Sequence, residues 1–161
     1  MRVGIGYDIH RLREGRRLVL GGIEFPTPVG CDAHSDGDVV LHAVADALLG
    51  AAALGDLGEH FPDTDEAWRD ADSAGILARV VEMVAARGLR VSNVDVNLHA
   101  ELPKIAPRRD EMRLNLASLL AVSQDRVSIK ARTAEGLGPI GRGEALEAHA
   151  VVLLEEADSE Q

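Results

Sequence analysis

Apolar and polar side chains alternate over the first ten residues of the chain, and this period of two predicts a β-strand. Its apolar face is made of Val3, Ile5, Tyr7 and Ile9. The opposite face carries Asp8 and His10, because successive side chains of a strand point to opposite sides. The pattern therefore predicts an N-terminal strand that presents a carboxylate and an imidazole on the same face.

Further along the chain, apolar residues recur every three or four positions, which predicts helices. The first helix begins at about Asp38, a good capping residue, and stops at Gly55. The second covers about residues 72–87. The third begins near Pro107, since proline suits the first turn of a helix, and ends near Leu120.

Short apolar runs outside the helices predict the remaining strands. They are Arg17–Ile23, Val91–Leu98, Val127–Ala131 and Ala145–Leu154. The order β, β, α, α, β, α, β, β predicts an α+β fold, a mixed β-sheet with three helices packed on one face. Residues 1–161 are expected to form a single domain. An apolar sheet face without helices over it would need another subunit, so we expect an oligomer.

The composition of the chain limits the classes of protein to which it can belong. Hydrophobic residues make up 46% of the sequence but aromatic residues only 2%, so the core must be aliphatic and base-stacking surfaces for nucleic acid are not expected. The net charge of −10 would repel a nucleic-acid polymer, although a bound metal ion could still attract a small phosphorylated ligand. Cys31 is the only cysteine, which excludes an intramolecular disulfide and a thiolate zinc cluster within one chain.

Targeting and membrane segments are not evident in the sequence. The N-terminus lacks the long apolar stretch of a signal peptide, and the chain contains no apolar run of about 18 residues. We therefore expect a cytoplasmic protein without a membrane partner.

Three residues have the chemistry of a divalent-metal site. Asp8 and His10 share one face of the first strand, and His42 lies near the start of the first helix. Three nitrogen and oxygen ligands with an open fourth position are typical of catalytic zinc. The spacing also allows His34 in place of Asp8, or simply an exposed aspartate and two ordinary histidines. Asp46, one helical turn after His42, could accept a hydrogen bond from the free ring nitrogen of that histidine and fix its tautomer.

Two polar segments flank the first helix. His34–Asp38 precedes the helix N-terminus, where free N–H groups and the helix dipole attract anions, and His34 and Ser35 could add donors to a phosphate. Simple capping would be the commoner role of such a segment. Asp56–Asp65 is acidic and could form a lid that holds a polyhydroxylated group. The alternative for this second segment is a solvated acidic loop.

A glycine-rich loop, Thr133–Gly143, contains a formal G-x-G-x-x-G pattern. We reject a dinucleotide-binding interpretation, because Pro139 interrupts the loop and a strand rather than a helix follows it. The loop could still approach phosphate oxygens closely, with Glu135 holding a hard ion such as magnesium and Arg142 pairing with phosphate. The alternative is a glycine-rich β-turn.

Taken together, these segments resemble the 2-C-methyl-D-erythritol 2,4-cyclodiphosphate synthases of the non-mevalonate isoprenoid pathway. The resemblance covers almost the whole chain. It begins with Gly4–His10 and continues to the last strand, and its most specific stretches are Ala33–Asp38, Leu41–Asp56, Phe61–Asp65 and Gly141–Glu144. Several independent motifs occur in the family's order, which separates the resemblance from a chance match.

The resemblance implies a homotrimer whose sheets face the three-fold axis and whose active sites lie between subunits. It implies zinc on Asp8, His10 and His42, and magnesium or manganese on Glu135. In the implied reaction, the 2-phosphate of 4-diphosphocytidyl-2-C-methyl-D-erythritol 2-phosphate attacks the β-phosphorus of the same molecule. CMP then leaves and the cyclic diphosphate forms.

The site residues of the family map onto positions of this chain. His34 and Thr133 correspond to the groups that stabilise charge on the reacting phosphorus. The Ala100–Ala106 segment matches the cytosine pocket, and the Arg132–Glu135 segment matches the surroundings of the CDP phosphates. The implied substrate-binding residues are Asp8, His10, His34, Ser35, Asp56, Leu57, Gly58, Phe61, Pro62, Asp63, Thr64, Asp65, Ala100, Glu101, Leu102, Pro103, Lys104, Ile105, Ala106, Arg132, Thr133, Ala134, Glu135, Pro139 and Arg142.

Some positions depart from the pattern of the family. Arg132, Ala134 and Pro139 stand in a loop that is often threonine-rich and carries an aromatic residue near position 139. His149 replaces an acidic residue of some relatives, which use that region with Arg142 to hold an isoprenoid diphosphate along the trimer axis. These departures concern the phosphate and nucleotide contacts and leave the implied metal ligands unchanged.

Two other functions fit the same residues. A zinc-dependent phosphohydrolase would use the same ligands with a bound water and would release linear phosphates. A metal-stabilised trimer acting as a sensor would bind isoprenoid diphosphates without releasing CMP.

Overall fold

The computed structural model describes residues 1–62 and 72–157. Its strands are β1 (Arg2–Glu14), β2 (Leu18–Leu20), β3 (Ile23–Phe25), β4 (Val29–Cys31), β5 (Leu89–His99), β6 (Val127–Arg132) and β7 (Ala145–Glu156). Its helices are α1 (Val39–Ala51), α2 (Leu57–His60), α3 (Ser73–Ala85), α4 (Arg109–Leu119) and α5 (Gly138–Gly141). In these two ranges, no helix has both the length and the apolar character needed to cross a membrane.

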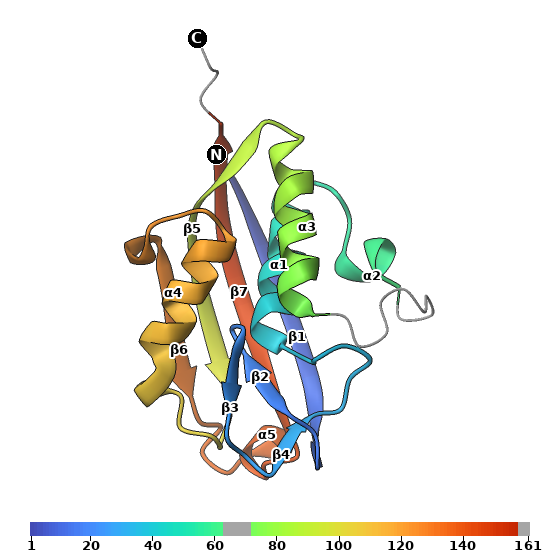
Figure 1. Cartoon of the computed structure of the whole chain (residues 1–161), viewed down its shortest axis with the longest axis vertical. Helices are drawn as coiled ribbons and strands as arrows, with labels where there is room; N and C mark the ends of the chain where they lie inside the picture. Colours follow the sequence, from blue (N-terminus) through green and yellow to red (C-terminus); the bar gives the residue numbers. More distant parts are fainter. Residues whose placement is uncertain (63–71, 158–161) are drawn as a thin grey trace.

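The described strands form one mixed sheet of five strands in the order β4-β1-β7-β5-β6, and β2 and β3 form a separate hairpin. Strand β7 is antiparallel to both of its neighbours, β1 and β5, whereas β5 and β6 run parallel. In Figure 1, the three long helices α1, α3 and α4 lie on one face of this sheet. The predicted α+β fold with a mixed sheet is therefore confirmed.

Helix α1 packs very closely on β1, because glycines occupy the positions where the helix crosses the strand. A Cβ atom on Gly4 would lie 2.0 Å from the backbone oxygen of Ala47, and one on Gly6 would lie 2.0 Å from that of Ala43. No side chain larger than hydrogen fits there, so the backbone of α1 rests on the backbone of β1. This contact brings the first turn of α1, which carries His42, close to the polar face of β1.

The sheet face opposite the helices is open in the single chain. Val3 and Ile5 of β1 are 70% and 71% exposed, and Val151 of β7 is 44% exposed. Gly4 and Gly6 lie on the other side of β1 and are buried under α1. The predicted alternation along the first strand is confirmed, and its apolar side is the side that no helix covers.

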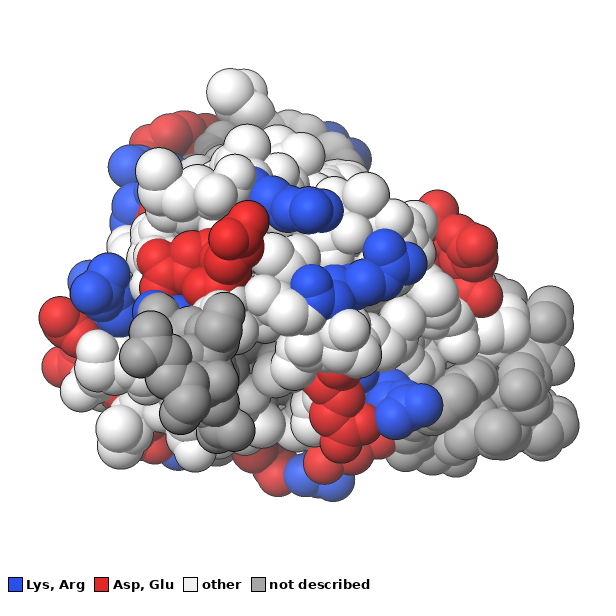
Figure 2. Space-filling model, turned by 90° about the horizontal axis from the view of Figure 1, so that it is seen from above, with Lys and Arg blue, Asp and Glu red and all other residues white. Residues whose placement is uncertain are grey.

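Charged side chains of both signs share the surface of the molecule that is seen from above. In Figure 2, Lys and Arg side chains lie between Asp and Glu side chains on this face. The net charge of −10 is therefore not concentrated as one acidic patch in this view.

Several element boundaries differ from the prediction: α1 ends at Ala51 rather than Gly55, β1 continues to Glu14, and two further differences concern turns. The run Arg17–Ile23 is a hairpin rather than one strand, because Gly21 and Gly22 have φ angles of +60° and +75° and reverse the chain. Pro107 lies in a 3₁₀ turn, and α4 begins at Arg109. These last two differences lie in turns, where local geometry outweighs the apolar pattern.

Candidate active site

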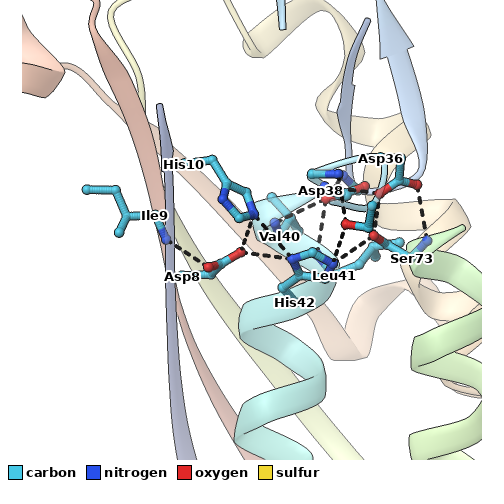
Figure 3. Close-up of polar contacts among 12 residues, drawn as sticks. Asp8, Ile9, His10, Asp36, Asp38, Val40, Leu41, His42 and Ser73 are labelled. Carbon is cyan, nitrogen blue, oxygen red and sulfur yellow. Dashed lines mark hydrogen bonds and ion pairs between the residues drawn. The ribbon is translucent and has the colours of Figure 1, made fainter. Parts of the chain in front are cut away.

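Side chains from two elements converge where α1 begins above β1 (Figure 3). The Nδ1 atom of His42 lies 2.9 Å from Oδ2 of Asp8, and Nε2 of His10 lies 3.1 Å from the same oxygen. The two ring nitrogens are 3.5 Å apart. One oxygen and two nitrogens thus face a common centre, and this donor set fits a divalent metal ion.

The geometry separates the two ligand sets that sequence spacing allowed. Asp8, His10 and His42 form the metal-type group found among the described residues, with ligand atoms all within 4.8 Å of one another. His34 does not belong to this group. The alternative with His34 as the third ligand is therefore not supported by the arrangement of the side chains.

The charges within this triad stabilise one another. Burial raises the pKa of Asp8, but hydrogen bonds and charges from His10 and His42 outweigh it and hold that pKa well below its usual range. Burial lowers the pKa of His42, but the contact with Asp8 and the charges of Asp38 and Asp36 outweigh it and raise that pKa overall. Asp8 is thus held as a carboxylate, the form that binds a cation.

A cavity of about 300 Å³ opens beside the triad. His34 and Ser35, which the sequence predicted at a phosphate site, form part of its wall together with His10 and His42. Leu57, Phe61 and Ile76 form its apolar side. The predicted phosphate-binding residues and two of the metal-type residues therefore face the same space.

Helix α1 starts at this point because Asp38 caps it. The fully buried carboxylate accepts four backbone hydrogen bonds at 2.6–3.1 Å, from Gly21, Gly22, Val40 and Leu41. Burial raises the pKa of Asp38 to about 6, although these N–H groups act in the opposite direction. The carboxylate ties the turn between β2 and β3 to the start of α1, and so it fixes where the first turn of the helix lies.

The hydrogen-bond partner predicted for His42 is wrong. Asp46 accepts a hydrogen bond from the backbone of Leu57 at 3.1 Å and so anchors α2. The Nε2 atom of His42 lies 2.9 Å from the hydroxyl of Ser73, the first residue of α3, and Ser73 donates to Asp36. The ring points away from its own helix toward α3 (Figure 3). Sequence reasoning did not connect Ser73 with His42, because the two lie 31 residues apart, and it considered Asp36 only as part of the His34–Asp38 segment before the first helix.

The predicted lid begins with the short helix α2. Asp56 caps it by accepting a hydrogen bond from a backbone N–H at 2.9 Å. Leu57 and Phe61 line the cavity beside the triad, Gly58 lines a neighbouring smaller one, and Pro62 is half-buried. The remaining residues of the predicted lid, Asp63, Thr64 and Asp65, lie outside the described residues.

The predicted nucleotide-binding residues lie at the end of β6 and in the segment after β5. The backbone N–H of Ala134 donates to Oε1 of Glu101 at 2.8 Å, which joins the two predicted segments. The hydroxyl of Thr133 donates to Glu135 at 2.9 Å. Ala100 and Ile105 are buried and Pro103 is half-buried, whereas the exposed members of the set are Leu102, Lys104, Ala106, Arg132, Thr133, Glu135, Pro139 and Arg142.

These two halves of the predicted site do not meet within one chain. The strand registers place Asp8, Ala148, Leu98 and Ala131 in one row across β1, β7, β5 and β6. Neighbouring strands lie about 4.8 Å apart, so Asp8 and Ala131 are separated by about 14 Å. Glu135 follows β6 and is not part of the metal-type group. The structure thus brings together the triad with His34 and Ser35, and separately Glu101 with the 133–135 segment.

The α+β fold places the converging side chains of Asp8, His10 and His42 beside a cavity, and this arrangement fits a divalent metal ion. Residues 1–155 match the model of the YgbB family, and the chain belongs to this family. It is 56% identical over 156 residues to the 2-C-methyl-D-erythritol 2,4-cyclodiphosphate synthase of Gloeobacter violaceus, covering 97% of this chain and 96% of that protein.

Solved structures show the same similarity in three dimensions. A 2-C-methyl-D-erythritol 2,4-cyclodiphosphate synthase in a CDP-bound form has a TM-score of 0.89 and 44% identity, covering 96% of this chain and 100% of that one. The bifunctional IspDF of Campylobacter jejuni has a TM-score of 0.94 and 39% identity, covering 98% of this chain and 42% of that one. The chain therefore corresponds to one part of that longer protein.

Proposed function

We propose that this chain converts 4-diphosphocytidyl-2-C-methyl-D-erythritol 2-phosphate into 2-C-methyl-D-erythritol 2,4-cyclodiphosphate and CMP, as a phosphorus-oxygen lyase of isoprenoid precursor synthesis. The oxygen of the substrate's 2-phosphate forms a bond to the β-phosphorus, and the bond from that phosphorus to CMP breaks. The observation that carries the proposal is the convergence of Asp8, His10 and His42 beside the cavity that His34 and Ser35 line. The family membership and the CDP-bound form of a relative support it.

The residues of the site suit this chemistry. The nucleophile is already part of the substrate, so the protein needs no serine or cysteine nucleophile and acts by positioning and electrostatics. Zinc held by Asp8, His10 and His42, and magnesium or manganese held by Glu135, would supply Lewis-acid stabilisation of the diphosphate. His34 and Thr133 stabilise charge at the reacting phosphorus. The lid segment excludes water, which would otherwise hydrolyse the same bond.

We also propose that the chain works as a homotrimer with the open sheet faces turned toward the three-fold axis. This arrangement would cover the exposed apolar side chains of Val3 and Ile5. It would also complete the active site, by placing the 133–135 segment of one subunit near the triad of its neighbour. The separation of about 14 Å across the sheet supports a site shared between subunits.

The reaction products test the proposal. Purified protein is incubated with the CDP-linked substrate, zinc and magnesium, and the products are followed by phosphorus NMR. We expect the cyclic diphosphate and CMP in equal amounts. Linear phosphates would indicate a zinc phosphohydrolase, and ligand binding without CMP would indicate a sensor, so either result contradicts the proposal. His42→Ala is expected to lose turnover while sedimentation still shows the trimer, and full activity of this variant would refute the ligand set.

A further inference from the structure

The contact between His42 and Ser73 extends the proposed metal site beyond its ligands. Ser73 is only 1% exposed, so its hydroxyl is shielded from solvent. The Oγ atom lies 2.9 Å from Nε2 of His42 and donates a hydrogen bond to Oδ1 of Asp36. Figure 3 shows His42 between Ser73 and Asp36 on one side and the triad residue Asp8 on the other.

The number of protons on Asp36, Ser73 and His42 determines which group donates and which accepts in each of these hydrogen bonds. A serine hydroxyl carries one proton, and Ser73 donates it to the carboxylate of Asp36. The oxygen of Ser73 can then only accept a hydrogen bond from His42. Nε2 of His42 must therefore carry a proton, so in the neutral imidazole, the form that binds a metal ion, the lone pair lies on Nδ1, which faces the centre of the triad.

The carboxylate of Asp36 is itself held in a fixed orientation. Its Oδ2 accepts a hydrogen bond from the backbone N–H of Ser73 at 3.1 Å, and its Oδ1 accepts one from the backbone N–H of Asp38 at 3.2 Å. These donors belong to the start of α3 and to the residue that caps α1. The packing of the two helices therefore sets the position of the carboxylate, and through Ser73 it sets the plane of the His42 ring.

We propose that Ser73 and Asp36 are positioning residues of the metal site, which select the Nε2-protonated tautomer of His42 and direct Nδ1 toward the ion. The inference rests on the proposed zinc site. Histidine ligands of metals commonly donate their second N–H to a carboxylate or carbonyl, and removing that partner typically weakens metal affinity 10–100-fold. In this chain a buried serine stands between the imidazole and the carboxylate.

Zinc affinity, measured by competition with a chromophoric chelator, tests the inference. Ser73→Ala is expected to weaken zinc binding by about 10–100-fold, and Ser73→Thr, which keeps a hydroxyl, is expected to recover most of it. Ser35→Ala is the matched control, because its Oγ lies 3.4 Å from the same nitrogen without a comparable contact to Asp36. We expect Ser35→Ala to stay within about twofold of the unmodified protein, since the contact of its hydroxyl with Nε2 is longer than that of Ser73 and does not continue to Asp36.

The visible spectrum of the cobalt-substituted protein supplies a second readout, because it reports ligand geometry independently of stability. It should change in Ser73→Ala and not in Ser35→Ala. Unchanged affinity and spectrum in Ser73→Ala would overturn the inference and leave the zinc site standing. Equal zinc affinity of His42→Ala and the unmodified protein would show instead that the proposed metal site is wrong.

A second variant decides the matter if Ser73→Ala does not fold. Asp36→Asn keeps the shape of the side chain but replaces a charged acceptor with a neutral one. We expect a loss of zinc affinity of about fivefold, from the difference between charged and neutral hydrogen bonds. Affinity equal to that of the unmodified protein would overturn the inference.

Discussion

Replacing Gly6 with alanine would test whether the close contact between β1 and α1 holds the triad together. A Cβ atom at Gly6 would lie 2.0 Å from the backbone oxygen of Ala43 and 2.6 Å from the backbone nitrogen of Ala47. These atoms belong to the helix backbone and cannot rotate away, so α1 must move as a unit. Extending the 2.0 Å contact to an ordinary 3.4 Å requires a shift of about 1.4 Å, the difference between the two distances.

Such a shift should lower both stability and metal affinity. Overpacking of a buried contact typically costs 1–3 kcal/mol, and because backbone meets backbone here we expect a loss of about 3 kcal/mol in the free energy of unfolding. His42 adjoins Ala43, so the same shift carries Nδ1 away from Asp8 and His10. Metal–ligand distances tolerate only about 0.2 Å, and zinc affinity should therefore fall by about tenfold or more.

Urea unfolding of the metal-free protein and chelator competition for zinc measure the two effects. Gly75→Ala is the matched control, because Gly75 lies in α3 and nothing is within 4 Å of an added Cβ. The control should be neutral or stabilising by up to about 1 kcal/mol, since alanine favours helix. A free energy of unfolding for Gly6→Ala within about 0.5 kcal/mol of the unmodified protein would refute the reasoning.

Three further outcomes follow from the structure. Burial raises the pKa of Asp38 to about 6, so the folded state keeps a proton that the unfolded chain loses near pH 4. This proton contributes on the order of 3 kcal/mol to stability below about pH 4, and the contribution is lost as pH rises to about 6. Urea unfolding of Asp38→Asn at several pH values should not show this loss. Zinc at 100 times its dissociation constant should stabilise the protein by about 2.7 kcal/mol, seen as a higher melting temperature that His10→Ala abolishes and a chelator reverses. Ile5→Glu should convert the proposed trimer to monomers in sedimentation velocity, because it places a charge on the open sheet face. Leu114→Glu, on the exposed side of α4, should leave the assembly unchanged. A trimeric Ile5→Glu variant would contradict the proposed packing of the sheets around the three-fold axis.

The amino-acid sequence by itself determined the local elements and the candidate chemistry. Alternation along the first strand placed Asp8 and His10 on one face, because side-chain direction in a strand depends only on position. The helical period and the capping residue Asp38 located the start of α1 and therefore placed His42 in its first turn. These features were predictable since each depends on residues a few positions apart.

The apolar pattern missed the turn that Gly21 and Gly22 make, and a residue outside the run holds that turn in place. The predicted strand over Arg17–Ile23 is a hairpin, and the buried carboxylate of Asp38 accepts hydrogen bonds from the turn at Gly21 and Gly22. No pattern within the run records that partner, which lies 16–17 residues away. The apolar positions alone therefore indicated a strand without its turn.

Only the tertiary structure decided how the site is assembled. It selected Asp8 over His34 as the third member of the triad, and it placed Ser73 rather than Asp46 beside His42. It also separated the triad from the end of β6 by the width of the sheet. The physical reason is the same in each case: these relations depend on how α1 packs on the glycines of β1 and how α3 packs on α1, and such contacts join residues that no local period relates.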